Sequence, residues 1–183
     1  EGLRDGLPRG ARGRPGLRAQ PGRGRPPDLG PGVPSHPRPA LNPTALHPEP
    51  DPRFTLRVYW EDTDAGGVVF YANYLKFFER ARTEWLRSLG FGQEALRRDE
   101  GLVFVVAETS VRYLQPARLD DVLLVGVDPR ERGRASLVVA QQCWRREAGG
   151  ETLLAEGTIR IGCVDAGTFR PRRIPTLLLE RLA

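Results

Sequence analysis

The stretch EDTDAGGVVFYANY, from Glu61 to Tyr74, places three carboxylates within four residues, then two glycines, and then an apolar run that leads into a helix. Apolar side chains recur from Tyr74 to Leu89, and Gly90 is placed to end the helix. Asn73 has a side chain typical of a helix N-cap. The apolar positions cover more than one narrow stripe, so we expect other structure on most sides of this helix.

Segments with strand character lie on both sides of the helix in the sequence. Residues 54–60 alternate and are rich in β-branched and aromatic side chains. Four further segments of this kind follow, near 102–114, 121–129, 134–146 and 152–165. A last short helix is expected at 175–182. One long helix followed by a meander packs most economically when the sheet curls around the helix, so we predict an α+β hotdog fold with an antiparallel sheet of about five strands.

Residues 1–52 differ sharply in composition from the rest of the chain. They hold 13 of the 17 prolines, eight arginines and no aromatic residue, so they cannot bury enough apolar surface to offset their ordering entropy. We predict a disordered Arg/Pro/Gly-rich tail over 1–52 and one folded domain over 53–183. The domain carries 20 basic and 18 acidic residues, and this near-neutral balance argues against a nucleic-acid partner.

The sequence shows neither the apolar run of a membrane span nor the cysteine spacing of a metal site or a disulfide framework. No apolar run approaches the roughly 18 residues of a membrane span, and no secretory signal is recognisable, so we expect a cytoplasmic protein without a membrane span. Cys143 and Cys163 lie inside strand segments without metal-ligand spacing, and we expect them to be buried structural thiols.

The positions of the histidines narrow the chemistry. His36 and His47 are the only two, and both lie in the tail. The folded domain therefore lacks the imidazole of a Ser/His/Asp triad or of a His-ligated metal site, and we expect neither a metal nor a cofactor. A general base or nucleophile in the domain must be a carboxylate, a Tyr, a Cys or the single Lys76.

A resemblance rests on the run from Arg57 to Leu86. This run is similar to the signature of the 4-hydroxybenzoyl-CoA thioesterase family of hotdog proteins, most of all to its Tol-Pal system-associated acyl-CoA thioesterases. The segments 113–121, 163–165 and 170–175 fit the same pattern, so the resemblance covers nearly all of 54–183 and none of the tail. It implies hydrolysis of a short-chain aliphatic or aromatic acyl-CoA to free acid and CoA, where CoA is part of the substrate. A cell-envelope complex is a partner by analogy alone.

Within this resemblance Asp64 matches the catalytic aspartate of the family. Its carboxylate can attack the thioester as a nucleophile or deprotonate a water as a general base. The start of the following helix offers N–H groups and the positive end of a dipole to the developing oxyanion. Gly66 and Gly67 lack Cβ atoms and let the backbone approach a substrate carbonyl.

Further candidates lie around Asp64. Tyr71 stands where many close relatives have histidine; a phenol with a pKa of about 10 is a poor base but can donate a hydrogen bond. Its backbone N–H is a candidate oxyanion donor, and simple packing is the alternative. Asn73 is first a helix cap and second a substrate-positioning residue. Glu79 is a second candidate acid, although pairing with Arg82 or Arg80 is the favoured interpretation.

The other charged residues of the motif receive supporting roles. Glu61 and Asp62 are expected to orient the loop or to pair with arginines such as Arg57. The phosphates of CoA require a cationic rim. The candidates for this rim lie in turns, where charge is usually just solvated: Arg132, Arg134, Arg170, Arg172 and Arg173.

Two predictions concern assembly and the competing function. A sheet of about five strands leaves open edges that a second chain commonly closes, so we expect a homodimer or homotetramer. The alternative function is a non-catalytic hotdog module that binds acyl chains or a partner, in which Asp64 is merely structural.

Overall fold

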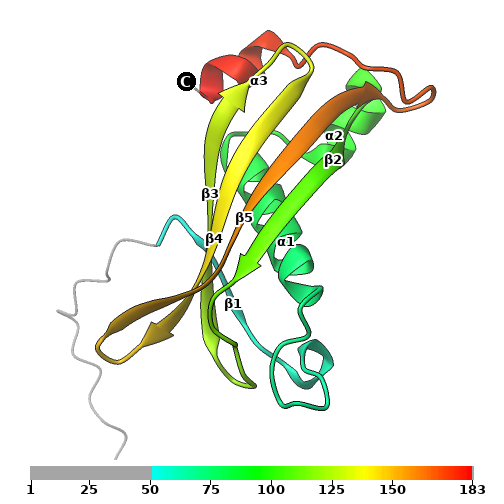
Figure 1. The fold of residues 1–183 in the computed structure, drawn as a ribbon. Coiled ribbons are helices and arrows are strands. Elements are labelled where there is room, and N and C mark those ends of the chain that lie inside the picture. Colours follow the sequence, from blue (N-terminus) through cyan, green and yellow to red (C-terminus); the bar gives the residue numbers. More distant parts are fainter. Residues whose placement is uncertain (1–50, 183) are drawn as a thin grey trace, which may run out of the picture. The chain divides into compact units, whose positions relative to one another are not determined.

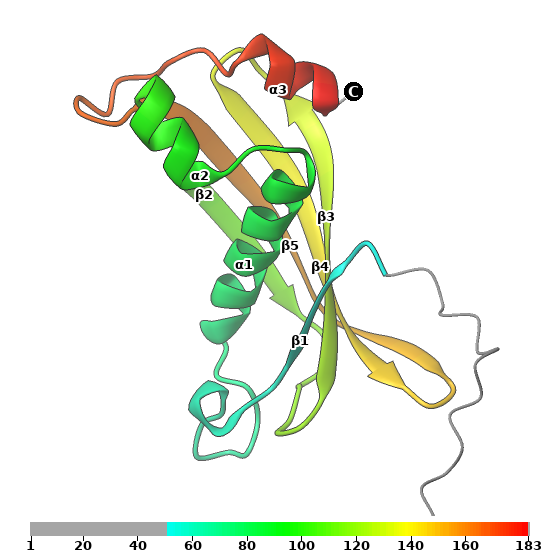
Figure 2. The same cartoon turned by 180° about the vertical axis from the view of Figure 1, so that it is seen from behind.

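The structure, a computed structural model, describes residues 51–182. The predicted disordered tail lies outside the described residues except for Asp51 and Pro52. Within the described range, a five-stranded sheet curls around one long helix (Figure 1), and the view from behind shows the helix lying along its concave face (Figure 2). The predicted α+β fold is confirmed.

The sheet has an order that the sequence pattern did not reveal. Its strands are β1 (Phe54–Arg57), β2 (Leu102–Tyr113), β3 (Val122–Arg132), β4 (Ser136–Glu147) and β5 (Gly150–Asp165). They lie side by side as β1-β3-β4-β5-β2, and all four pairings are antiparallel. The prediction of one continuous meander was wrong for β2, which pairs with β5 instead of β3. This order places the strands before and after the long helix at opposite edges, so the chain segment that contains the helix passes from one edge of the concave face to the other.

The long helix, α1 (Asn73–Ser88), begins and ends one residue earlier than the predicted 74–89, and Leu89 is its C-cap. Gly90 has a left-handed φ of 91° and donates its N–H to the Arg87 carbonyl at 2.8 Å, while Phe91 donates to Leu86 at 3.1 Å. This pair of hydrogen bonds is the Schellman motif, which satisfies the last helical carbonyls. A glycine is favoured at this position because side chains with a Cβ strain there.

The core lies between α1 and the sheet. The helix buries Phe77, Phe78 and Ala81 completely or nearly so. Gly157 of β5 permits the close approach: a Cβ there would lie 3.0 Å from Cε2 of Phe78 and 3.0 Å from the Ser110 carbonyl oxygen. Because Gly157 has no side chain, the helix can pack closer to the sheet at this point.

Four short helical elements complete the described part of the domain. The chain after β1 forms a 3-10 turn, η1 (Trp60–Asp62), so the predicted strand over 54–60 stops at Arg57. The segment after α1 forms α2 (Gln93–Ala95) and a π-helical turn, η2 (Leu96–Glu100), which the sequence pattern missed because Leu96 is the only buried side chain among largely charged neighbours. The expected last helix is present as α3 (Thr176–Arg181).

Both cysteines are free and buried, as predicted. Burial raises the pKa of the Cys143 thiol to about 12. A thiol with such a pKa stays protonated near neutral pH, so it is a poor nucleophile.

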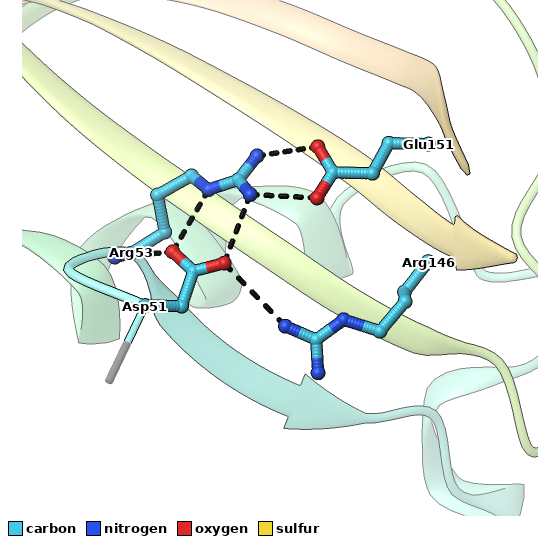
Figure 3. A network of polar contacts seen from close by, with 4 residues as sticks. All are labelled: Asp51, Arg53, Arg146 and Glu151. Atoms are coloured by element: carbon cyan, nitrogen blue, oxygen red, sulfur yellow. Dashed lines mark hydrogen bonds and ion pairs between the residues drawn. The ribbon is translucent and has the colours of Figure 1, made fainter. Parts of the chain in front are cut away.

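A network of four charged side chains joins the start of the domain to the β4–β5 hairpin (Figure 3). The guanidinium of Arg53 binds both Asp51 and Glu151, with shortest contacts of 2.9 Å and 2.7 Å. Arg146 adds a longer contact of 3.4 Å to Asp51. These side chains are partly shielded from water, so their pairing is screened less than that of fully exposed ion pairs.

Among residues 51–182, no helix combines the length and the apolar character that crossing a membrane requires.

Candidate active site

The loop before α1 is held by a buried aspartate and a buried asparagine. Asp62 is 6% exposed, and its carboxylate accepts the Tyr59 backbone N–H at 2.9 Å. Its backbone carbonyl accepts two further hydrogen bonds at 2.9 Å, from the Asn73 side-chain amide and from the Phe70 N–H. Asp62 therefore orients the loop, as one of the two predicted roles requires. The predicted pairing with Arg57 is wrong, because that guanidinium donates to the Asp120 carbonyl.

Asn73 does not cap the helix. The N-cap is Ala72, which makes no side-chain capping bond, and Asn73 is the first helical residue. Its side chain is buried and reaches back across the loop to Asp62. The capping prediction was wrong because the amide is used for this tertiary contact, which ties the start of α1 to the turn before Asp64.

Asp64 projects from the tip of this loop and is exposed. Its Oδ1 accepts the Gly66 N–H at 2.8 Å, and its backbone N–H and carbonyl bond to Val68 and Gly67 at 2.9 Å and 3.0 Å. Gly67 takes a left-handed φ of 72°, which the tight turn needs. The turn holds the carboxylate in one orientation and leaves it open to a reactant. The same bonds occupy the N–H groups of Gly66 and Gly67, so these groups support Asp64 instead of facing solvent.

Unpaired N–H groups lie at the start of α1. In the described part of the chain, the backbone N–H groups of Tyr71 and Ala72 have no backbone acceptor. They precede the first turn of a 16-residue helix, whose dipole is positive at this end. An anion or a carbonyl oxygen close to them would be stabilised. Tyr71 itself is 61% exposed.

An aromatic hollow adjoins the same loop. It has a volume of about 250 Å³ and is lined by Val69, Tyr71, Tyr74, Tyr113, Leu114, Gln115 and Pro116. The Tyr113 hydroxyl donates to the Tyr71 carbonyl at 3.0 Å, and the Tyr74 hydroxyl accepts the Ala117 N–H at 3.1 Å. Burial raises the pKa of Tyr74 to about 12, so this phenol stays neutral. The hollow is mostly uncharged and suits a small acyl group or a thioester arm.

Three comparisons with known proteins bear on this site. The profile of the thioesterase superfamily matches residues 66–152. The acyl-CoA thioesterase YbgC of Haemophilus influenzae is 43% identical over 122 residues, which are 67% of this chain and 87% of that protein. The acyl-CoA thioester hydrolase YbgC of Escherichia coli O6:H1 is 46% identical over 123 residues, or 67% of this chain and 89% of that protein. The chain belongs to the thioesterase superfamily.

A solved structure agrees on the fold of this thioesterase. A 4-hydroxybenzoyl-CoA thioesterase variant, complexed with 4-hydroxybenzoyl-CoA, superimposes with a TM-score of 0.66 at 21% identity, covering 71% of this chain and 96% of that one. This structure confirms the hotdog fold, and the relatives of 43% and 46% identity confirm the predicted family resemblance. The superfamily profile begins at Gly66, two residues after Asp64, and includes Tyr71, Asn73 and Glu79.

Glu79 of the thioesterase is not an ion-pair partner of its helix neighbours. Its Oε1 accepts the Thr83 hydroxyl at 2.7 Å, and among residues 51–182 no ion pair within 4.0 Å joins it to Arg82 or Arg80. The predicted pairing was wrong because Arg82 turns toward the sheet, where it binds Gln141 at 2.7 Å. Glu79 is the seventh of the 16 residues of α1, roughly 9 Å along the helix axis from Asn73.

The candidate phosphate arginines gather at the other end of the thioesterase. The Ile174 N–H bonds to the Arg134 carbonyl at 2.9 Å, which places the segment of Arg170 and Arg173 beside the β3–β4 turn. The Nη1 of Arg172 donates to the Glu100 carbonyl at 3.0 Å and lies 3.4 Å from Oδ2 of Asp165. Arg172 therefore anchors the end of η2 to the end of β5. Figure 1 shows this end and the Asp64 loop at opposite ends of α1, roughly 24 Å apart along a helix of this length.

Sequence reasoning named Tyr71 as a site residue but missed the other two tyrosines of the hollow, Tyr74 and Tyr113. Tyr113 lies in a segment that carried the family resemblance, but nothing in its spacing indicates that it meets Tyr71, 42 residues earlier. The described residues contain no group of three or more His, Cys, Asp or Glu side chains that could hold a metal ion.

Proposed function

We propose that this protein hydrolyses the thioester of an acyl-CoA, with a short aliphatic or an aromatic acyl group, and that Asp64 is the catalytic carboxylate. One observation carries the proposal: an exposed carboxylate, oriented by the Gly66 N–H, precedes the unpaired N–H groups of Tyr71 and Ala72 at the positive end of α1. The acyl-CoA thioesterases of 43% and 46% identity support the substrate class.

Two routes satisfy this arrangement. In the first, Asp64 attacks the carbonyl carbon, CoA leaves as a thiolate that takes up a proton, and water then hydrolyses the mixed anhydride. In the second, Asp64 takes a proton from a water, whose oxygen attacks the carbonyl carbon; the C–S bond then breaks, and CoA leaves as a thiolate that takes the proton back from Asp64. In both, the Tyr71 and Ala72 N–H groups stabilise the negative oxygen that forms on the carbonyl. The Tyr71 phenol is a hydrogen-bond donor in this scheme and takes no proton.

The assembly of the enzyme is part of the proposal. β2 lies at the edge of the sheet, and its outer side has no strand partner among residues 51–182. Antiparallel pairing of β2 with the same strand of a second copy continues the sheet and gives the expected homodimer. It also brings the arginine end of one copy toward the Asp64 loop of the other, where these arginines reach the CoA phosphates. A cytoplasmic location and a cell-envelope partner remain predictions.

The test is thiol release from a panel of acyl-CoA esters by the full chain, comparing wild type with Asp64→Asn. We expect a loss of about a hundredfold or more in kcat for the variant, because an amide is neither nucleophile nor base. Asp64 is exposed, so the variant should stay folded. Equal rates for the two proteins would remove Asp64 from the mechanism. Absence of hydrolysis by folded wild type would favour the non-catalytic module.

A further inference from the structure

A second pocket lies beside α1, away from the Asp64 loop. It has a volume of about 170 Å³ and lies between the second half of α1 and the strands β2, β4 and β5. Arg82, at its polar side, is nine residues beyond Asn73, which is roughly 13 Å along the helix axis. Its apolar walls include Trp85, Leu86, Phe104, Leu137 and Ile161.

Arg82 presents an incompletely paired cation to this pocket. Its Nη1 donates to Oε1 of Gln141 at 2.7 Å, and this is its one hydrogen bond within residues 51–182. No carboxylate of those residues lies within 4.0 Å of the guanidinium. Burial lowers the pKa of Arg82, an effect that the charge of Glu79 opposes, yet a guanidinium remains protonated. The remaining N–H donors are directed to no other protein group.

The side chain of Gln141 holds the Arg82 guanidinium in place. It is 1% exposed, and its amide nitrogen donates to the Phe78 carbonyl at 3.0 Å. Both ends of the amide are thus engaged, one with the backbone of α1 and the other with Arg82. A buried polar side chain that is fully satisfied in this way fixes the orientation of the guanidinium.

Glu79 also lines the pocket, but it has its own donors. The Thr83 hydroxyl donates to Glu79 at 2.7 Å, and the Gln93 amide donates to the Thr83 hydroxyl at 2.7 Å. This chain holds the Glu79 carboxylate without the help of Arg82. Its negative charge still acts within the pocket and opposes an anion there, which the experiment below uses.

We propose that this pocket binds a small organic carboxylate, with its carboxylate on Arg82 and its hydrocarbon body against Trp85, Phe104 and Ile161. A guanidinium binds a carboxylate through two parallel hydrogen bonds, the geometry for which its spare donors are suited. Among residues 51–182 no buried side-chain nitrogen or oxygen lacks a hydrogen-bond partner, so the spare donors of Arg82 are open to solvent, where a ligand that enters the pocket can reach them. An apolar cavity of about 150 Å³ holds benzene, so this pocket takes one ring or a short chain.

The carboxylate has two possible sources, a free acid or the far end of the acyl group of a CoA thioester. Binding of a free acid needs no catalysis, so this inference stands or falls separately from the proposed role of Asp64. Three consecutive residues of the edge strand β2, Phe104, Val105 and Val106, line the pocket, so a second copy paired along β2 would lie beside it. The full chain, in the form in which it assembles, is therefore the form to titrate.

The test is calorimetric titration of the full chain with benzoate and butyrate, and with benzamide as a neutral analogue. We expect the acids to bind and Arg82→Gln to weaken them by roughly tenfold or more. Glu79→Gln should tighten them several-fold, because it removes an opposing charge without disturbing the shape. Arg80→Gln, an exposed neighbour on the same helix, is the matched control and should leave affinity unchanged. If Arg82→Gln does not fold, Arg82→Lys replaces it in the titration. This variant keeps the positive charge but loses the planar guanidinium, so it should also weaken binding of the acids.

Several results would overturn the proposal: no binding of either acid to folded wild type, equal affinity for benzamide, or equal affinity in the Arg82 variants. A second arm separates the two sources by comparing hydrolysis of glutaryl-CoA and valeryl-CoA. If the acyl group supplies the carboxylate, Arg82→Gln raises KM for glutaryl-CoA alone. If a free acid is the ligand, the variant changes the binding of benzoate and affects the two thioesters equally.

Discussion

Oδ1 of Asp64 lies 2.8 Å from the backbone nitrogen of Gly66, which donates a hydrogen bond to it. The proposed catalytic carboxylate is therefore oriented by a residue only two positions away. A loop of local hydrogen bonds, instead of the sheet, sets the direction of the reactive group. Small changes inside the loop should alter the reaction more than they alter stability.

Gly66→Ala tests this directly. A Cβ at this position would stand 3.1 Å from the same Oδ1, so the carboxylate must move aside. We expect kcat/KM to fall by about tenfold or more, while the free energy of unfolding changes by less than about 0.5 kcal/mol. Gly67→Ala is the control, because its Cβ would meet no atom within 4 Å but would be strained by a φ of 72°. It should cost about 1 kcal/mol of stability. Unchanged kcat/KM in Gly66→Ala would argue against Asp64.

Substitutions of Asn73 distinguish its hydrogen bond to the Asp62 carbonyl from a role as helix N-cap. Asn73→Ala removes a buried hydrogen bond to the Asp62 carbonyl and should cost roughly 1–2 kcal/mol in urea unfolding. Asn73→Asp should cost more, because a carboxylate cannot donate and would be buried next to a carbonyl oxygen. A capping residue would tolerate Asp well. A neutral Asn73→Asp variant would thus restore the capping interpretation.

Gly157 should be intolerant of even a methyl group. Gly157→Ala places a Cβ 3.0 Å from both the Phe78 ring and the Ser110 carbonyl oxygen, so α1 must lift from the sheet. We expect a loss of about 1–3 kcal/mol in the free energy of unfolding. Gly162→Ala in the same strand is the matched control, since its nearest contact would be 3.8 Å. Similar effects from the two substitutions would show that strand propensity, and not helix contact, matters.

The network at the start of β1 should make stability depend on pH. Arg53 lowers the pKa of Asp51 and of Glu151 chiefly by hydrogen bonding to each. A carboxylate whose pKa is lowered by folding stabilises the protein above its unfolded pKa of about 4, and that stability is lost as pH falls through the folded value. Arg53→Gln should therefore lower Tm at pH 7, and its difference from wild type should shrink below about pH 4.

Arg130→Gln is the control for this measurement, because the Arg130–Asp128 pair is well exposed, with 63% and 56% of the side chains accessible. It should leave Tm unchanged at every pH. A Tm difference for Arg53→Gln that does not vary with pH would mean that packing of the Arg53 stem, and not its charge, stabilises the hairpin.

The thiols should be unreactive in the folded protein. Burial raises the pKa of Cys143 to about 12 and also raises that of Cys163. The thiolate is the reactive species, so a thiol reagent at about pH 8 should label neither cysteine in the native state and both in denaturant. Rapid labelling of native Cys143 would show that β4 opens locally.

Local patterns determined much of this protein. The apolar run after Asn73 and the glycine at position 90 were enough to predict α1 almost to the residue, because helix periodicity and a left-handed end residue are local properties. The alternating segments predicted all five strands for the same reason. The acidic loop and its match to a thioesterase signature identified Asp64 as the candidate carboxylate, with no histidine in the domain to compete.

Tertiary structure alone decided which residues meet. The placement of β2 beside β5 depends on pairing between segments some 50 residues apart. The alternating pattern of a strand does not specify which other strand it pairs with. The same holds for Asn73 with Asp62, Tyr113 with Tyr71, and Arg82 with Gln141. Asn73 and Arg82 each had a plausible local role, as a helix cap and as an ion-pair partner of Glu79, but each forms a longer-range contact instead, because burial makes an unsatisfied polar group more costly than a lost surface ion pair.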